Sequence, residues 1–400
     1  MNILYIHQYF RIPNEPGGTR SYWIARKLVE EGHKVFMLTT GTNVSKTIEE
    51  KIIDGINVIY MKIPYDPKMK ILLRFVSFLR FMFRSATYAF RMKSINMVIA
   101  TSTPLTVGFP ALFLKKIKHI PYLFEVRDLW PEVPFQMGGL RNSVLLKVAY
   151  WFEKIVYKNA TYIIALSPGM REGIISKNIS AQKVFMIPNM AKIEEFYPRE
   201  KNLILNKDLK LRLDSFKVIH FGALGLANGV ETIIDTAELL NGKANVEFVF
   251  IGRGSIEDKL QLEIRKRKLD NVKFLGEFPM KMTSEIVNLC DASIVSFMNL
   301  PILFTNSPNK LFDSLSAGKP IIVNSAGWTK NMVEDYKCGY YVDPLKPRDL
   351  ANKILYLKNN PDVGYKMGLN SRKLAEEKYD KVLLCKEFYN VVKLFITEDV

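Results

Sequence analysis

Short apolar runs alternate with amphipathic helical patterns along almost the whole chain, and this alternation restricts the fold more than any other feature. Near-continuous runs of Val, Ile, Leu and Phe are typical of strands buried on both faces of a parallel sheet. In the first half, strands are predicted at 2–6, 34–39, 58–60, 97–100, 122–126, 162–166 and 184–187, with helices at 19–31, 70–92, 105–116, 143–158 and 168–176. In the second half, strands are predicted at 217–221, 246–251, 272–275, 292–296, 320–323 and 340–342. The pattern predicts two tandem doubly wound, Rossmann-like α/β domains facing a central cleft, with ligands at the carboxyl ends of the strands.

The chain is too long for one hydrophobic core, and its 48% hydrophobic content is sufficient for two. The alternation lapses after Pro188 and Asn189, where a charged and polar stretch begins. We therefore expect an N-terminal domain over 1–198, a linker over 199–215 and a C-terminal domain over 216–380. Long helices are predicted at 361–378 and 381–397, and the segment 381–400 is expected to cross back and pack on the N-terminal domain.

The chain carries 57 Lys and Arg residues against 40 Asp and Glu, a formal net charge of +17. Such an excess predicts an anionic partner, which is a nucleic acid, a phosphorylated substrate or an acidic lipid. No recognition helix or RNA-binding module is recognisable, so we expect no nucleic-acid partner.

The sequence favours a cytoplasmic protein without a membrane span. Cys290, Cys338 and Cys385 lie far apart, so neither a zinc site nor a disulfide is expected. The N-terminal residues resemble a first strand and not a signal peptide. Residues 94–114 carry no charge and are long enough to cross a bilayer, but Pro104 and Pro110 interrupt them. We predict a buried strand followed by a helix.

Glycine turns precede several predicted helices, where backbone N–H groups can approach an anion that the helix dipole favours. Gly17 and Gly18 precede the first helix, and Gly222 follows the strand at 217–221. The chain contains neither G-x-G-x-x-G nor the phosphate loop G-x-x-x-x-G-K-[ST] at these turns, so nicotinamide chemistry and phosphoryl transfer from ATP lack their usual signature.

The segment from Ser307 to Pro320 is the most specific functional motif in the sequence. Ser307 is a suitable N-cap, with Pro308 in the first helical position. Lys310 in the first turn, together with free backbone donors, can hold a diphosphate. His7 and His220 lie at strands and are interpreted as core histidines.

Six motifs occur in order along the chain. They are GGTRSY at 17–22, EGHKV at 31–35, EVRDLWPE at 125–132, IPN at 187–189, FGALG at 221–225, and PNKLFD at 308–313 followed by AGKP at 317–320. Together they resemble the group 1 (family-four) glycosyltransferases, closest to the WbuB-like enzymes of O-antigen and capsule assembly. The resemblance implies the GT-B fold, a nucleotide-sugar donor held mainly by the C-terminal domain, retention of anomeric configuration, and neither an essential metal nor a cofactor.

The resemblance also implies which residues bind the donor. They are Gly17, Gly18, Gly222, Arg253, Lys259, Asn309, Lys310, Leu311 and Asp313. Asp313 is expected to accept hydrogen bonds from a ribose. Thr305 and Leu226 stand where the family often has a glutamate and a basic residue, so the diphosphate must be neutralised by Lys310, Arg253, Lys259 or a helix N-terminus.

Arg127 and Asp128 are the expected catalytic residues. Arg127 stands where relatives often have His, and because a guanidinium stays protonated it cannot act as a base. It can stabilise a departing diphosphate, which leaves Asp128 as the carboxylate near the acceptor hydroxyl.

The helix predicted over 68–93 contains seven basic residues and no acidic residue. Arg74, Arg80, Arg84 and Arg91 fall on one side of it, and leucines and phenylalanines dominate the other. This composition is typical of an interfacial helix on anionic lipid. The alternative is a helix that packs on the sheet and has a basic outer face.

The sequence therefore predicts a retaining glycosyltransferase that moves a sugar, with a UDP-sugar favoured as donor, to a lipid-linked saccharide acceptor in surface polysaccharide assembly. We expect the enzyme to be metal-independent and peripheral on the inner face of the cytoplasmic membrane. Two alternatives remain open, which are a nucleotide-sugar epimerase or hydrolase of the same fold, and a non-catalytic scaffold for polysaccharide assembly.

Overall fold

The computed structural model describes residues 1–41, 44–66 and 69–397. Its contacts divide the chain into two compact units. The first unit comprises Met1–Ile12, Gly18–Pro188 and the C-terminal segment from Val382, and the second comprises Pro13–Gly17 and Asn189–Lys381. Lys68, the first residue of the predicted basic helix, and residues 398–400 of the predicted C-terminal segment lie outside the described residues.

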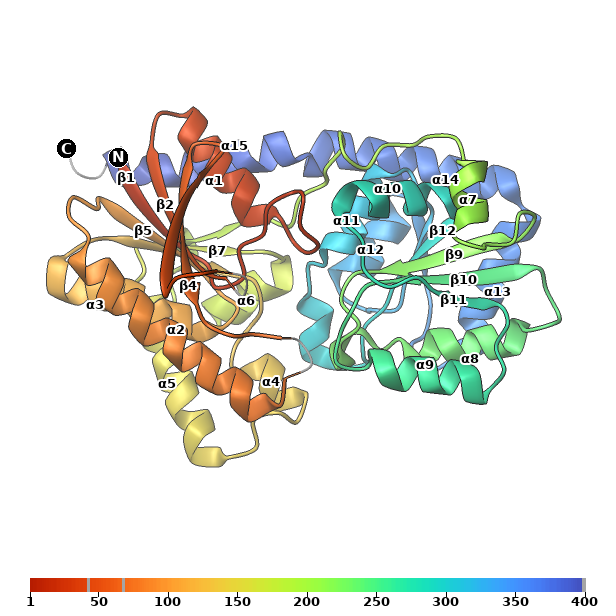
Figure 1. The fold of residues 1–400 in the computed structure, drawn as a ribbon, viewed down its shortest axis with the longest axis horizontal. Coiled ribbons are helices and arrows are strands. Elements are labelled where there is room, and N and C mark those ends of the chain that lie inside the picture. Colours follow the sequence, from red (N-terminus) through yellow and green to blue (C-terminus); the bar gives the residue numbers. More distant parts are fainter. Residues whose placement is uncertain (42–43, 67–68, 398–400) are drawn as a thin grey trace. The chain divides into compact units, whose positions relative to one another are not determined.

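In the described part of the first unit, eight strands form one sheet in the order β3-β4-β2-β1-β5-β6-β7-β8 (Figure 1). The strands are β1 (Asn2–Ile6), β2 (Lys34–Gly41), β3 (Ile48–Ile53), β4 (Ile56–Lys62), β5 (Met97–Thr101), β6 (Tyr122–Val126), β7 (Tyr162–Ala165) and β8 (Val184–Met186). Neighbouring strands are parallel except β3 with β4. Strand β3 is not recognisable from the sequence, because the charged Glu49, Glu50 and Lys51 interrupt the apolar pattern of this edge strand.

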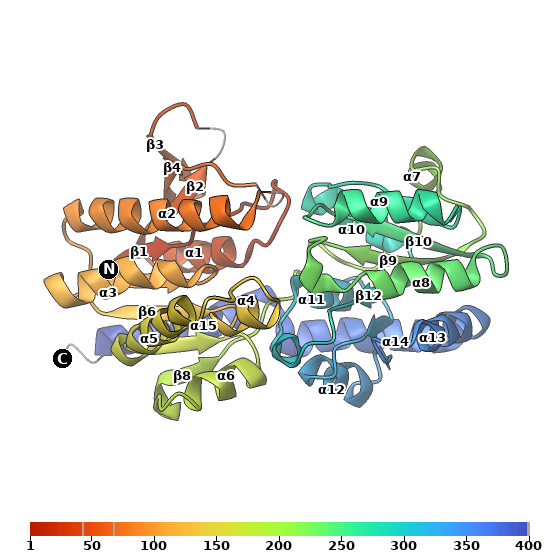
Figure 2. The same ribbon diagram turned by 90° about the horizontal axis from the view of Figure 1, so that it is seen from below.

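The helices of the first unit are α1 (Arg20–Glu30), α2 (Ile71–Arg91), η1 (Leu105–Val107), α3 (Gly108–Lys118), α4 (Glu132–Gln136), α5 (Ser143–Asn159), α6 (Pro168–Ile175) and η2 (Ala181–Lys183). Helix α3 packs against both α2 and α5, and Figure 2 shows the three side by side. The uncharged segment 94–114 forms β5, η1 and the start of α3, as predicted. None of the described helices combines the length and hydropathy needed to cross a bilayer.

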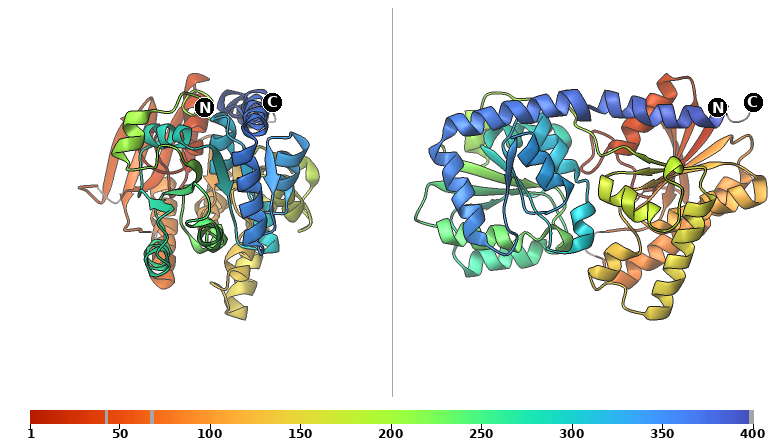
Figure 3. Two further views of the ribbon diagram at one scale, coloured as in Figure 1. Left: turned by 90° about the vertical axis from the view of Figure 1, so that its right-hand side faces the viewer. Right: turned by 180° about the vertical axis from the view of Figure 1, so that it is seen from behind.

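The last described helix, α15 (Lys381–Thr397), joins the first unit, as the sequence predicts for the C-terminal segment. The ring centroid of Tyr389 lies 5.7 Å from that of His33, and the centroid of Phe395 lies 5.3 Å from that of Tyr162. Figure 3 shows this blue helix along the first unit, seen from behind in its right-hand view. Aromatic packing between residues far apart in sequence therefore attaches the chain end to the unit in which the chain begins.

In the described part of the second unit, six parallel strands form a sheet in the order β11-β10-β9-β12-β13-β14. They are β9 (Phe216–Phe221), β10 (Val246–Ile251), β11 (Val272–Phe274), β12 (Ala292–Val295), β13 (Ile321–Val323) and β14 (Gly339–Tyr341). The helical segments are α7 (Leu203–Asp208), η3 (Leu226–Asn228), α8 (Glu231–Leu240), α9 (Glu257–Lys266), α10 (Met280–Leu289), η4 (Pro301–Thr305), α11 (Asn309–Ser316), α12 (Trp328–Asp335), α13 (Pro347–Asn359), α14 (Pro361–Leu374) and η5 (Ala375–Tyr379).

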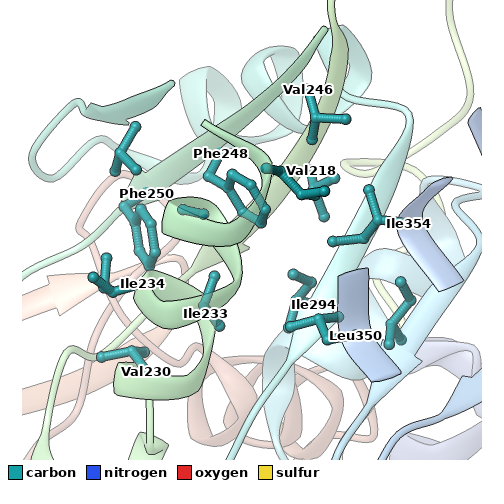
Figure 4. Packing of buried hydrophobic residues seen from close by; sticks show 14 of the residues in the cluster. Val218, Val230, Ile233, Ile234, Val246, Phe248, Phe250, Ile294, Leu350 and Ile354 are labelled. Carbon is teal, nitrogen blue, oxygen red and sulfur yellow. The ribbon is translucent and has the colours of Figure 1, made fainter. Parts of the chain in front are cut away.

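A hydrophobic cluster holds this second sheet to its helices. Figure 4 shows strand residues Val218, Phe248 and Phe250 packed against Ile233 of α8 and Ile354 of α13. Each of these side chains is at most 1% exposed. Full burial of one such side chain stabilises the fold by about 1.5–3 kcal/mol.

The change of unit comes earlier in the chain than the predicted end of the N-terminal domain at 198. The backbone N–H of Asn189 donates to Ser307 Oγ at 3.2 Å, and its side chain donates to the Ser307 carbonyl, so the chain is attached to the second unit directly after Pro188. The segment 199–215, predicted as a linker, contains α7. Leu205 and Leu209 pack there against a buried cluster of the same unit. The mostly charged segment 199–215 therefore packs on the core of the second unit, because a few apolar residues such as Leu205 and Leu209 are sufficient for this packing.

A buried ion pair joins the start of α1 to β6, an interior strand of the first sheet. Arg20 Nε lies 2.7 Å from Glu125 Oε1, and both side chains are fully buried. The guanidinium also donates to the carbonyls of Ile187, at 3.0 Å, and Pro188. The other carboxylate oxygen accepts from Thr101 Oγ1 at 2.9 Å. Both charges therefore have the additional hydrogen bonds that a buried pair requires.

We predict that Glu125→Gln lowers the free energy of unfolding by about 3 kcal/mol or more, because it leaves the Arg20 charge buried without a counter-charge. Urea unfolding followed by circular dichroism measures this change. The matched control is Glu30→Gln, which removes an exposed i,i+4 partner of Arg26 at 3.3 Å and should change stability by at most about 0.5 kcal/mol. Equal effects of the two substitutions would contradict a structural role for the buried pair.

Candidate functional site

Two βα turns of the second unit meet at the carboxyl ends of β9 and β10. Gly222 has φ of 104° and Gly252 has φ of 135°, conformations that favour glycine. A β-carbon on Gly252 would lie 1.8 Å from the Gly222 carbonyl oxygen, so no larger residue fits there. Gly222 N donates to the Ile251 carbonyl at 2.9 Å. Gly222 therefore lies at a strand end, as expected, and Gly252 is needed for the turns to approach each other.

Lys310, in the first turn of α11, reaches this pair of turns. Its Nζ donates to Asn228 Oδ1 at 2.9 Å and lies 3.1 Å from His220 Nε2. The side chain is 8% exposed, and a β-carbon on Gly222 would lie 3.5 Å from its Cε. Burial lowers the pKa of Lys310 to about 7. Both of these hydrogen-bond partners are neutral, and among the described residues no carboxylate pairs with this buried cation at the strand ends.

His220 and Asn228, which hold Lys310, are not identified as site residues from the sequence. Burial, followed by the charge of Lys310, lowers the pKa of His220 well below its ordinary value. Its imidazole is therefore neutral, and Nε2 can accept the proton of Lys310. The only sequence signal for this contact is that His220 lies one residue before the end of a strand that leads into the glycine turn.

Asp313 and Leu311, which are also predicted site residues of α11, have partners inside the protein. Lys192 Nζ lies 2.7 Å from Asp313 Oδ1, and both side chains are less than a tenth exposed. Burial raises the pKa of Asp313 while Lys192 lowers it. Leu311, predicted to bind the donor, is wholly buried in the hydrophobic core, because it lies on the inner face of the helix with Phe312 and Leu315. Asn309 is half-buried at the first position of α11.

The predicted cap of α11 is wrong in one respect. The helix begins at Asn309, Pro308 occupies the N-cap position, and no side chain caps the helix. Ser307 Oγ accepts instead from the backbone N–H of Asn189. The hydroxyl is therefore used to attach the incoming chain and is not available to the first turn of the helix.

The other basic residues predicted to bind the donor are exposed, as is Gly17, whereas Gly18 is half-buried. Arg253 and Lys259 have side chains 54% and 63% exposed, and they pair with Glu257 at 3.9 Å and with Glu231 at 3.5 Å. Gly17, with φ of 121°, and Gly18 form the turn before α1. Because exposed pairs contribute little, both cations remain available to another anion.

In the first unit, Arg127 follows directly after β6 and is held from two sides. Its side-chain Nη1 lies 3.4 Å from His7 Nε2, and its backbone N–H donates to Ser102 Oγ at 3.1 Å. The guanidinium only donates, so Nε2 accepts and Nδ1 carries the proton of the imidazole. Ser21 Oγ lies 2.9 Å from that Nδ1. Burial and then Arg127 lower the pKa of His7 well below its ordinary value, consistent with a neutral ring.

Asp128 lies next to Arg127 and is half-buried. Its Oδ2 accepts from Thr103 Oγ1 at 2.7 Å. Burial raises the pKa of Asp128, and Thr103 and Arg127 oppose the rise. A carboxylate with a raised pKa is suited to accept a proton near neutral pH. The sequence predicts the Arg127–Asp128 pair but not His7 or Thr103, although His7 directly follows β1 and Thr103 comes two residues after β5.

Four half-buried aromatic residues form a row beside this pair. Ring centroids are separated by 4.5 Å between Tyr9 and Tyr65, by 6.5 Å between Tyr65 and Phe78, and by 6.2 Å between Phe78 and Trp130. Phe78 belongs to α2, and Trp130 comes two residues after Asp128. The row therefore extends from α2 to the segment that contains Asp128.

Two family models match the chain. The model of glycosyl transferases group 1 matches residues 203–374, and the model of the glycosyl transferase 4-like domain matches residues 17–190. The first range contains Lys310 and the glycine turns, and the second contains Arg127 and Asp128. The two matches together span most of both units.

Curated relatives and solved structures are similar over most of the chain. The probable glycosyltransferase WbjE of Pseudomonas aeruginosa is 21% identical, over 91% of this chain and 90% of its own length. The capsular polysaccharide biosynthesis glycosyltransferase CapM of Staphylococcus aureus is 23% identical, over 69% and 71%. Sucrose-phosphate synthase of Thermosynechococcus elongatus has a TM-score of 0.78 with 16% identity over 99% of each chain. Anabaena HepE, solved with UDP-glucose, has a TM-score of 0.71 with 18% identity over 98% and 99%.

We predict that the buried Lys310 makes the stability of the second unit depend on pH. Its pKa is about 7 in the folded chain and near its ordinary 10.5 in the unfolded chain, so between these values the unfolded chain binds more protons. The free energy of unfolding therefore rises with pH in this window, by at most about 1.4 kcal/mol per pH unit. Relative to Lys310→Met, the wild type should become more stable from about pH 7 to about pH 9, measured by urea unfolding.

The matched control is Lys366→Met, which removes an exposed lysine of α14. Its stability difference from wild type should stay constant over the same pH range. A constant difference for Lys310→Met as well would show that Lys310 is not titrating in the window.

Proposed function

The chain belongs to the group 1 glycosyltransferases with the GT-B fold, and from this membership we propose that it transfers a hexosyl or N-acetylhexosaminyl group from a UDP-sugar to a lipid-linked acceptor. The acceptor we propose is a polyprenyl-diphosphate-linked saccharide of bacterial surface polysaccharide assembly. Transfer retains the anomeric configuration and needs no metal ion. The name of CapM, a capsular polysaccharide enzyme, supports the polysaccharide part of the proposal.

The buried position of Lys310 is the main evidence for the proposed nucleotide-sugar donor. A buried lysine hydrogen-bonded to neutral His220 and Asn228 has lost hydration without gaining a counter-charge. A diphosphate would provide that charge, and charge-assisted hydrogen bonds would then raise the pKa of Lys310 so that it stays protonated. The UDP-glucose complex of HepE supports a uracil nucleotide as the donor. The exposed Arg253 and Lys259 are further candidates for the same diphosphate.

Asp128 and Arg127 are the residues that we propose act on the acceptor hydroxyl and the leaving group. Asp128, with its raised pKa, accepts the proton of the acceptor hydroxyl as that hydroxyl attacks the sugar. The hydrogen bond from Thr103 fixes one carboxylate oxygen, and the other remains for the hydroxyl. Arg127, positioned by neutral His7, stabilises the negative charge of the departing diphosphate. The aromatic row from Phe78 to Trp130 offers an apolar path for the lipid or a stacking surface for the saccharide.

We predict that two substitutions affect different steps, one the binding of UDP and the other the transfer of the sugar. Lys310→Ala should weaken UDP binding by about 1.5–3 kcal/mol, because one charge-assisted contact is lost. Asp128→Asn should leave UDP binding unchanged and lower kcat for transfer by about 10²-fold or more, because the amide cannot take the proton. Calorimetry with UDP and a transfer assay, both in EDTA, measure the two effects.

The same assays separate the competing functions. UDP-sugar consumed at full rate without acceptor would indicate an epimerase or hydrolase, and neither binding nor consumption of donor would indicate a scaffold. Loss of transfer in EDTA that Mg²⁺ restores would contradict metal independence. UDP binding unchanged in Lys310→Ala would remove this lysine from the donor site.

Helix α2 is the basis for proposing a peripheral membrane location. Arg80, Arg84 and Arg91 are exposed, and Arg74 is half-buried. Apolar side chains of the same helix are exposed as well, namely Leu72, Leu73, Phe75, Phe83 and Phe90. A helix that packed on the sheet with a purely basic outer face would not expose these apolar groups. Both types of side chain suit an anionic bilayer surface.

We predict that replacing Arg80, Arg84 and Arg91 together with Gln weakens binding to anionic vesicles about 100-fold at low salt, since each basic residue contributes about 1 kcal/mol. Vesicle flotation measures the effect. The matched control replaces exposed Lys243, Arg265 and Lys266 of the second unit with Gln, which changes the net charge equally. Equal flotation of both triple variants would show that α2 is not the membrane contact. Transfer to a water-soluble acceptor analogue should be unchanged in both.

A further inference from the structure

The N-terminal half of α5 carries an apolar stripe that nothing in the described part of the unit covers. Val144, Val148 and Trp151, spaced i, i+4 and i+7, are 69%, 52% and 63% exposed. Leu145 next to them is 40% exposed. Trp151 is the only exposed member of the four tryptophans, all of which are described. Contiguous exposed apolar groups of this size are typical of an interaction surface.

The packing of α5 explains why this half is free. The buried residues of the helix are Glu153, Val156 and Tyr157, all in its C-terminal half. Tyr157 contacts Phe124 of the sheet, with ring centroids 5.9 Å apart. Figure 1 shows the N-terminal half extending away from the strands. Asn142 caps this free end, since its Oδ1 accepts from Leu145 N at 3.0 Å. A capped helix end is therefore formed without core contacts of its own.

The charges around the stripe are basic. Exposed Arg141, Lys147, Lys154 and Lys158 lie along and beside the helix. The one acidic residue of α5, Glu153, is buried in an ion pair with Lys177. The nearby Glu132 accepts from Gln136 Nε2 at 2.6 Å and from Tyr150 Oη. The exposed surface thus combines apolar groups with uncompensated positive charge, which complements acidic lipid headgroups.

The location of α5 favours the same partner. It lies beside α3, which in turn packs on the basic helix α2 (Figure 2). Ile117 of α3 is 56% exposed. Phe90 of α2 lies 5.7 Å from Phe113 of α3, measured between ring centroids. Exposed apolar groups therefore occur on all three neighbouring helices of one layer.

We propose that the N-terminal half of α5 is a second membrane anchor, which inserts Val144, Val148 and Trp151 into the headgroup–acyl boundary of an anionic bilayer. The indole of Trp151 is suited to that boundary because it has an apolar ring and a polar N–H. This inference rests on the proposed location of the enzyme at a lipid surface. It adds apolar insertion by α5 to the basic and apolar contacts proposed for α2.

Val148→Asp and Trp151→Ser test the proposal on vesicles of phosphatidylglycerol and phosphatidylcholine. Each should weaken flotation about tenfold or more, because a buried apolar side chain is lost from the bilayer. The emission of wild-type Trp151 should shift to shorter wavelength with these vesicles, and this shift should be absent in Trp151→Ser. The matched control is Leu262→Asp, an equal charge change at a 58% exposed leucine of α9, which should float as wild type does.

Flotation of Val148→Asp equal to that of wild type, or an emission shift that persists without Trp151, would overturn the proposal. So would a wild-type dimer in sedimentation that Val148→Asp converts to monomers, because a second copy would then cover α5. Transfer to a water-soluble acceptor analogue is measured on the same variants. Normal transfer with unchanged flotation disproves only the α5 anchor, whereas absent transfer in wild type disproves the proposed function.

Discussion

The buried pair between Arg20 and Glu125 is the constraint on which the first unit depends. Arg20, the first residue of α1, is bonded to Glu125 of the interior strand β6 and to the carbonyls of Ile187 and Pro188, and Glu125 in turn accepts from Thr101 at the end of β5. Arg127 and Asp128 follow β6 within three residues of Glu125. The candidate catalytic pair therefore has a rigid base, because a buried charge cannot leave its partner without a cost of several kcal/mol.

Lys310 presents the opposite arrangement. Its cation is buried like that of Arg20, but its hydrogen-bond partners at the glycine turns are neutral, and burial lowers its pKa to about 7. One buried cation thus has its counter-charge within the protein, and the other is the one that we propose binds the diphosphate of a ligand. Such a site lowers the stability of the free protein, which is the usual relation between stability and a preorganised binding site.

The two helices of the first unit that expose apolar side chains, α2 and α5, differ in how much of this exposure the sequence reveals. The basic character of the segment 68–93, which contains α2, is recognisable from its composition, because seven basic residues occur there without one acid. Helix α5 is different, since its apolar residues are as consistent with core packing as with exposure. Only the position of the helix end, beyond the contacts of Tyr157 with the sheet, decides that Val148 and Trp151 face outward.

The sequence by itself determined the two α/β halves, the strand ends followed by Gly222, Arg127 and Asp128, the helix start that carries Lys310, and the crossing of the C-terminal helix. These follow from local periodicity, because buried parallel strands and amphipathic helices each require a characteristic spacing of apolar residues. Only the tertiary structure decided that His220 and Asn228 hold Lys310, that Lys192 pairs with Asp313, and that Leu311 belongs to the core. Contacts between residues so distant in the chain leave no periodic trace, because they depend on which side chains the packed sheets bring within hydrogen-bond distance.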